Sequence, residues 1–236
     1  MSGRLASAIK PAPNIMGHLD HITLPKREEH FTLHLPAPGA GYGLFSFTDP
    51  REWQSYIIGL NLHPGVPLIV RAKYQRAQKL YYLGWIDYDL IIAGELVALT
   101  ALELALRDCY GGRPDLDQVK RHGAKSNNQK KGKKAASQPP KLADLCRYMV
   151  KGDGLKDEDI PLVRRCGGSV VKTLTGETRP SLYELRNVAT HGDPFDGLPR
   201  AGLIETIHDL IEYAYRDWIK NYVPMEIPDG VPEPDE

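Results

Sequence analysis

Three side chains capable of acid–base and anion chemistry lie close together in the segment Ser181 to Gly192, which reads SLYELRNVATHG. The imidazole of His191 titrates near neutral pH, so it can both accept and donate a proton. The guanidinium of Arg186 stays charged and can bridge two phosphate oxygens. The amide of Asn187 can orient the imidazole or a bound anion. These groups suit attack by a ribose 2′-hydroxyl on its own phosphate, a reaction that needs no metal and no cofactor.

The segment that carries these groups is predicted to be one short helix from Leu182 to His191. Ser181 and Glu184 have the spacing of a capping box, in which the serine hydroxyl and the glutamate carboxylate satisfy free backbone N–H groups. Gly192 follows as a helix stop. The buried stripe of this helix is formed by apolar residues three and four positions apart, namely Leu182, Leu185, Val188 and Ala189.

The polar face of the same helix carries Glu184, Asn187 and His191, and Arg186 lies at the edge of the stripe. Because Arg186 and His191 are five residues apart, their side chains point about 140° apart on a regular helix. One regular helix therefore does not aim both groups at one atom. Either the arginine curls around the helix, or the last turn opens at the glycine, or a second copy of the chain supplies the missing half.

The order of Arg186, Asn187 and His191, written RNVATH, resembles the motif of HEPN domains. The resemblance extends over the helical part of the chain from about residue 65 to 222, although only the dozen residues around the motif are specific. It implies a mainly α fold, a HEPN-like bundle of about five helices. It also implies a metal-independent endoribonuclease that acts on RNA as a homodimer, in a toxin or antiviral defence system, with these three residues as the catalytic groups.

Supporting roles on this hypothesis fall to Glu184, Glu103 and Tyr183. Glu103 and Glu95 lie two turns apart on a long apolar helix. The favoured interpretation is that they mark its least buried strip; the alternative is that one of them pairs with Arg186 or orients the motif histidine. Tyr183, expected to be exposed, is a candidate target for a modifying partner, such as a nucleotidyltransferase that serves as antitoxin.

Two other function classes stay open. The chain could be a non-catalytic dimeric module that binds RNA or scaffolds a defence or toxin–antitoxin assembly. Alternatively, chemistry could reside in an N-terminal group of histidines with metal-ligand spacing, namely His18, His21, His30 and His34. With no cysteine near them, imidazoles that face solvent are the favoured interpretation, and no metal is assigned.

Composition limits these classes further. The 236 residues include 30 basic and 30 acidic side chains, so any attraction for nucleic acid must be local. The three cysteines, Cys109, Cys146 and Cys166, are too few and too scattered for a disulfide framework or a zinc ribbon. No apolar run reaches about 18 residues, and the N-terminus lacks the apolar core of a signal peptide. A soluble cytoplasmic protein is expected.

The chain is predicted to divide into three parts. Residues 1–63 form a small appendage with two short strands, near 21–24 and 31–35, and a helix over 49–62. Residues 64–224 form the helical domain, with long helices over 66–83, 88–110 and 202–222 and shorter ones between them. The helix over 88–110 is apolar on more than one side and should lie at the centre of the bundle. Residues 225–236 form an acidic, proline-containing tail, expected to be disordered.

A basic insert over 119–141 interrupts the helical domain. It has no acidic residue and no large apolar residue after Val119, so it is expected to be a flexible loop. Such a loop can hold a phosphate backbone without sequence preference, or it can simply be a solvated spacer. The candidate RNA-binding residues are Lys120, Arg121, Lys125, Lys130, Lys131, Lys133 and Lys134.

Overall fold

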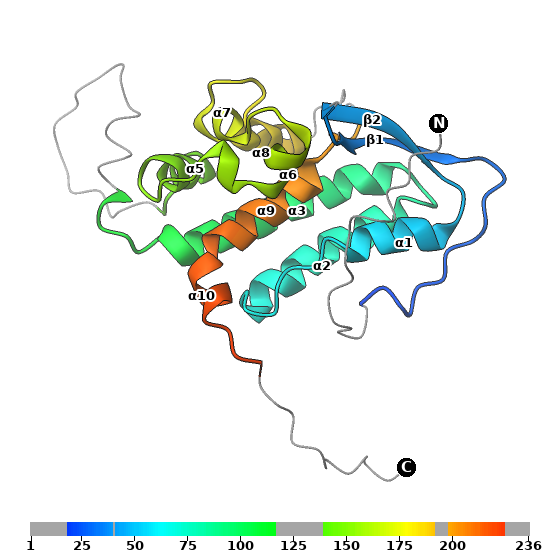
Figure 1. The fold of residues 1–236 in the computed structure, drawn as a ribbon, viewed down its shortest axis with the longest axis horizontal. Helices are drawn as coiled ribbons and strands as arrows, with labels where there is room; N and C mark the ends of the chain where they lie inside the picture. Colours follow the sequence, from blue (N-terminus) through cyan, green and yellow to red (C-terminus); the bar gives the residue numbers. More distant parts are fainter. Residues whose placement is uncertain (1–17, 40, 117–138, 192–197, 225–236) are drawn as a thin grey trace, which may run out of the picture.

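The computed structural model describes residues 18–39, 41–116, 139–191 and 198–224, with the side chains of 188–191 excepted. The fold is mainly α: a helical bundle with a small two-stranded sheet near the N-terminus (Figure 1). Its helices are α1 (Pro50–Ile58), α2 (Leu68–Leu83), α3 (Asp89–Tyr110), α5 (Leu142–Lys151), α6 (Pro161–Cys166), α7 (Val170–Thr175), α8 (Leu182–His191), α9 (Leu203–Ala214) and α10 (Arg216–Lys220), with a 3₁₀ turn at Asp157–Asp159. Within the described residues, none of these helices has the length and apolar character needed to cross a membrane.

The sheet is one antiparallel hairpin of β1 (Phe31–Ala37) and β2 (Gly41–Phe47). The prediction of a strand over 31–35 is confirmed, but the strand predicted near 21–24 is wrong, because that segment is turn and coil. The partner of β1 instead follows it directly. Gly39 and Gly41 adopt positive φ values of 72° and 71°, which glycine reaches without steric cost, so the chain can double back within a few residues.

The central element is α3, as its sequence predicted. It packs against α2, α5, α8 and α9 (Figure 1). Such a helix needs apolar or small residues on several sides, and Ala98, Leu99, Ala101 and Leu102 are all buried. Gly94 lets α2 approach closely, since a Cβ at this position would lie 2.7 Å from the ring of Tyr81.

The last long helix differs from its prediction. Instead of one helix over 202–222, α9 ends at Ala214 and the short α10 follows, and Trp218 of α10 is exposed. The break is held by two polar contacts. Arg216 makes two hydrogen bonds of 2.8 Å to Asp153, and the hydroxyl of Tyr215 donates to Asp108 at 2.7 Å. These contacts hold the chain where α9 ends and α10 begins, a feature that the apolar periodicity of the sequence does not reveal.

The N-terminal elements share one core with the helices that follow. Trp53 of α1 is fully buried, and its ring lies 5.2 Å from the rings of both Phe31 and Phe47. The indole N–H of Trp53 donates to the carbonyls of Tyr81 and Tyr82 at 3.2 Å. The predicted helix over 49–62 is present as α1, shorter at its C-terminal end, with the Asp49 carboxylate accepting from the N–H of Arg51. The hairpin and α1 are therefore packed onto α2 by buried aromatic rings.

Candidate functional site

The helix that carries the motif begins with the predicted capping box. The Ser181 N–H and hydroxyl donate to the Glu184 carboxylate at 2.9 and 2.8 Å, and the N–H of Glu184 donates to the serine oxygen at 3.4 Å. The two bonds from Ser181 lower the pKa of Glu184, with a smaller contribution from Arg179. Ser181 is buried, so this cap fixes where α8 starts. The Glu184 carboxylate therefore serves in the cap of α8.

Arg186 is held by a carboxylate from the central helix. Its Nη2 lies 3.3 Å from Oε2 of Glu103, and Nη2 of Arg107 lies 2.6 Å from Oε1 of the same side chain. The Glu103 side chain is 10% exposed, against 32% for Arg186 and 47% for Arg107. One nearly buried carboxylate thus binds two partly exposed guanidiniums, and the three side chains together carry a net positive charge.

The favoured prediction placed the two acids of α3 on the least buried strip of this helix, and it is wrong. Glu95 and Glu103 are both buried, at 8% exposure each. Both are buried with polar partners: Glu103 pairs with Arg186 and Arg107, and Glu95 accepts the backbone N–H of Arg200. The alternative, that one of these acids pairs with Arg186, is what the structure has. A buried carboxylate is tolerated when charged or hydrogen-bonding groups face it.

The remaining motif residues are described in part. Asn187 is exposed, and its side-chain oxygen lies 3.5 Å from Nη1 of Arg186, at the limit of a hydrogen bond. His191 is the last residue of α8, and its side chain is outside the described residues. The three ways to bring Arg186 and His191 together therefore stay predictions. The candidate RNA-binding residues also lie outside the described residues, namely Lys120, Arg121, Lys125, Lys130, Lys131, Lys133 and Lys134.

Tyr183, expected to be exposed, is only partly so. It lies on the core side of α8, packed against the buried cluster, and its ring is near Gly176 at the end of α7. A hydroxyl whose ring is packed in this way is less accessible to a modifying enzyme than the prediction assumed.

The described N-terminal histidines do not form a metal centre together with other ligands. No group of three or more His, Cys, Asp or Glu side chains in the described part of the chain is placed to hold a metal ion. His18 is half-buried, and burial, aided by the charge of Lys79, lowers its pKa to about 4. His34 lies on β1 and is exposed, as the alternation of the strand predicts.

The three thiols are free, and two of them are poor nucleophiles. Cys146 and Cys166 are buried and Cys109 is partly buried. Burial raises the pKa of both Cys109 and Cys146 to about 12, so their thiolate forms are scarce at neutral pH. Thiolate chemistry at either residue is therefore disfavoured.

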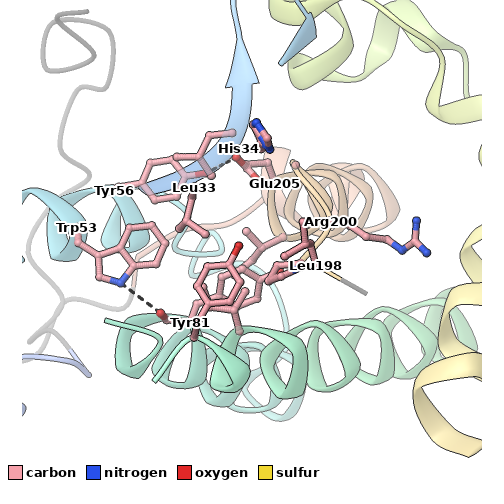
Figure 2. Close-up of a pocket in the computed structure, with 14 residues that line it drawn as sticks. Leu33, His34, Trp53, Tyr56, Tyr81, Leu198, Arg200 and Glu205 are labelled. Atoms are coloured by element: carbon pink, nitrogen blue, oxygen red, sulfur yellow. Dashed lines mark hydrogen bonds between the residues drawn. The ribbon is translucent and has the colours of Figure 1, made fainter. Parts of the chain in front are cut away.

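Sequence reasoning missed a cavity between the hairpin, α1, α2, α3 and α9 (Figure 2). Its polar centre is Glu205 of α9, which is 3% exposed and accepts a hydrogen bond from the hydroxyl of Tyr56 (Figure 2). One signal in the sequence could have pointed to it. Glu205 and Asp209 are spaced i and i+4, so they share one side of α9 beside its apolar residues, and acids buried there require partners.

Comparisons with known proteins do not name the family. No family model matches the chain, and no curated protein and no solved structure matches it either. The resemblance to HEPN domains thus depends on the RNVATH segment and its helical setting.

Proposed function

We propose that this chain is a metal-independent endoribonuclease in which Arg186, Asn187 and His191 act on one phosphodiester. His191 takes the proton from the ribose 2′-hydroxyl, and the 2′-oxygen forms a bond to the adjacent phosphorus. The bond from phosphorus to the 5′-oxygen breaks, and that oxygen takes up a proton. The products are a 2′,3′-cyclic phosphate and a 5′-hydroxyl end. DNA, which lacks the 2′-hydroxyl, is not cut.

The observation that carries this proposal is the way Arg186 is anchored. Glu103 holds the guanidinium from its buried side, while about a third of the side chain (32%) is open to solvent beside the exposed Asn187. A guanidinium fixed in this way needs little reorganisation to receive the charge that gathers on a phosphate in the transition state. Arg107, bound to the same carboxylate, adds positive charge next to it.

The position of the motif at the end of α8 also supports the proposal. Carbonyl groups at a helix C-terminus favour a cation, which assists an imidazole that must hold a proton during the reaction. Because Arg186 and His191 are five positions apart on this helix, we include a homodimer in the proposal, with one motif from each copy facing a shared RNA. A toxin or antiviral role, with an antitoxin or a nucleotidyltransferase as partner, belongs to the same hypothesis.

The test is to incubate purified protein with total RNA in a chelator and to map the fragment ends. The wild type is expected to leave 2′,3′-cyclic phosphates, and His191→Ala is expected to leave the RNA intact. Arg179→Ala serves as the matched control, since it removes an exposed arginine at the start of the same helix and should cut normally. Cleavage by His191→Ala at the wild-type rate would exclude the assigned role.

A second candidate function is a non-catalytic module that binds RNA or scaffolds an assembly. The Arg186–Glu103 pair favours it, because an arginine bound to a nearly buried carboxylate also serves an ordinary structural role. The same experiment separates the two. A scaffold yields no fragments with any variant, and the His191→Ala variant keeps whatever RNA affinity and oligomeric state the wild type has.

A further inference from the structure

Four of the fourteen residues that line the cavity of Glu205 are tryptophan or tyrosine. Trp53 and Tyr56 come from α1, Tyr81 comes from α2, and Tyr88 lies at the start of α3. The first two rings stack, with centroids 5.4 Å apart and an angle of 16° between their planes. Figure 2 shows Glu205 above Tyr81, with the tyrosine hydroxyl directed toward the middle of the space.

Two buried polar atoms at this cavity lack hydrogen-bond partners among the described residues. One is Oε2 of Glu205, whose other oxygen receives the Tyr56 hydroxyl. The other is the hydroxyl oxygen of Tyr81, which is 6% exposed as a residue. Buried polar atoms are rarely left unpaired, because each one costs about 1–3 kcal/mol. Two of them on one cavity offer hydrogen-bonding positions to a ligand that enters it.

Charged groups of both signs surround the cavity: Glu205 and Arg200 line it, and Asp209 and Arg165 both act on Glu205. Burial raises the pKa of Glu205, and this outweighs the bonds from Tyr56 and from the residue's own backbone N–H. Asp209 raises that pKa further, whereas Arg165 opposes the effect. Burial raises the pKa of the Tyr81 hydroxyl, and the charges of Glu95 and Glu205 raise it further. A positive ligand would let Glu205 ionise and would give the unpaired oxygen a partner.

We propose that this cavity binds a small organic cation, an alkylammonium headgroup, between the aromatic rings and the Glu205 carboxylate. The rings supply cation–π attraction, which is strongest where water is excluded. The Tyr81 hydroxyl and Oε2 of Glu205 supply acceptors for any N–H group on the ligand. This site is separate from the Arg186 surface and does not depend on ribonuclease activity.

The size of the cavity selects the ligand. Its volume is about 40 Å³, whereas one water requires about 10–15 Å³ in the same measure. It therefore holds a headgroup of a few heavy atoms and not a whole nucleotide or a drug-sized molecule. His34, Leu198 and Arg200 line its mouth, and the Arg200 guanidinium extends away from the cavity in Figure 2.

The experiment is calorimetric titration of the full chain with tetramethylammonium chloride, beside tert-butanol, a neutral molecule of similar shape. Measurable binding is expected for the cation only. Glu205→Gln keeps the side-chain shape and removes the charge, and it should weaken the affinity at least tenfold. Tyr81→Phe should weaken the binding of methylammonium, which has N–H groups, more than that of tetramethylammonium, which has none. Tyr74→Phe is the matched control, since this buried hydroxyl bonds to the carbonyl of Ile204 and does not line the cavity.

Three results would overturn the proposal. Equal binding of tert-butanol would mean that the cavity selects shape and not charge. Equal binding of tetramethylammonium by the wild type and Glu205→Gln, or an equal response to potassium chloride, would mean that the cation acts elsewhere or through ionic strength. Absence of binding by the wild type, together with a crystal structure that shows ordered water only, would mean that water satisfies the two atoms. If Glu205→Gln fails to fold, the comparison of the two cations on Tyr81→Phe still decides the matter.

Discussion

Two buried glutamates in this molecule have opposite surroundings. Glu103, on α3, faces the guanidiniums of Arg186 and Arg107. Glu205, on α9, faces the hydroxyl of Tyr56 and a cavity lined with aromatic rings. Both are nearly excluded from water, at 8% and 3% exposure, so the two sites differ mainly in the groups that face the carboxylate. Two guanidiniums face the Glu103 carboxylate, whereas burial raises the pKa of Glu205 although the hydrogen bond from Tyr56 opposes this effect.

The comparison shows that a buried carboxylate can support two different kinds of binding, depending on the groups around it. At the α3–α8 surface the charge of Glu103 positions a cation that faces solvent, which suits binding of an anion such as phosphate. In the cavity, burial opposes the charge of Glu205 until a cation arrives, which suits binding of an organic cation. Replacing the glutamate by glutamine should therefore change stability in opposite directions: a loss at Glu103 and a gain at Glu205.

The largest effect is expected from Glu103→Gln. The amide leaves Arg186 and Arg107 without their shared anion, and breaking a charged hydrogen-bonded pair costs about 1.5–3 kcal/mol. Because both arginines are partly exposed, solvent offsets some of this, and we expect a loss of about 2 kcal/mol in the free energy of unfolding. Urea denaturation at neutral pH measures it.

Glu158→Gln is the control for that measurement. Its carboxylate is exposed and pairs with exposed Lys156 at 3.4 Å, so the substitution should leave stability nearly unchanged. If Glu103→Gln lowers the free energy of unfolding no more than Glu158→Gln does, then Glu103 does not anchor Arg186.

The next largest effect concerns the phenol that faces Glu205. Tyr56→Phe removes the donor to Oε1 and leaves the buried acid with one partner fewer, which should lower the free energy of unfolding by about 1.5 kcal/mol. Thermal and urea unfolding both report it. The double substitution Tyr56→Phe with Glu205→Leu removes both polar groups and should recover part of the loss. A double variant less stable than Tyr56→Phe alone would contradict the unpaired-acid explanation.

The third effect is a pH dependence. The folded-state pKa of Glu205 is raised above its ordinary value of 4.5, so its stabilising contribution is fully present below that pH and is lost as pH rises through the folded pKa. Glu205→Gln has no such loss, so the variant should gain stability relative to the wild type as pH rises from 4.5 to 5.5. Asp209, Arg165 and Tyr56 face Glu205 and are unchanged in both proteins.

Unfolding free energies of the wild type and Glu205→Gln, measured across this range, test the sign. His208 also has a raised pKa, from its bond to Asp209 and the charge of Glu212. It is common to both proteins, so its effect cancels in the difference. A difference that stays constant with pH would show that burial does not raise the pKa of Glu205.

Local patterns in the sequence predicted much of the scaffold of both sites. The apolar run that ends at Gly111 predicted α3 nearly to the residue, and the Ser181–Glu184 spacing predicted the start of α8. These features depend on contacts within a few residues, such as a cap or a stripe, so the sequence alone contains them. The hairpin was half found, because β1 was predicted near 31–35 but the second strand was predicted near 21–24 and not at Gly41–Phe47, directly after β1.

The burial of the acids could not be predicted in the same way. Tyr56 and Glu205 are 149 positions apart, and Glu95 and Arg200 are 105 apart. A periodic pattern shows that an acid lies on an apolar helix, but the partner that permits its burial depends on how distant helices pack. For this reason Glu95 and Glu103 were expected on the least buried strip of their helix, and the cavity of Glu205 was not anticipated.

The smallest effect distinguishes the two arginines that share Glu103. Arg107 is one turn away on the same helix and is more exposed, so Arg107→Gln should cost about 0.5 kcal/mol, as exposed i,i+4 pairs do. Arg186 ties α8 to α3 and is less exposed, so Arg186→Gln should cost about 1 kcal/mol.

Urea denaturation measures the stability of both variants, and RNA cleavage by the same proteins separates a structural role from a chemical one. If Arg186 contacts the phosphate, its variant loses cleavage far beyond its modest loss of stability, while Arg107→Gln keeps most of it. Equal cleavage by the two variants would make Arg186 a structural tie between two helices and would favour the non-catalytic module.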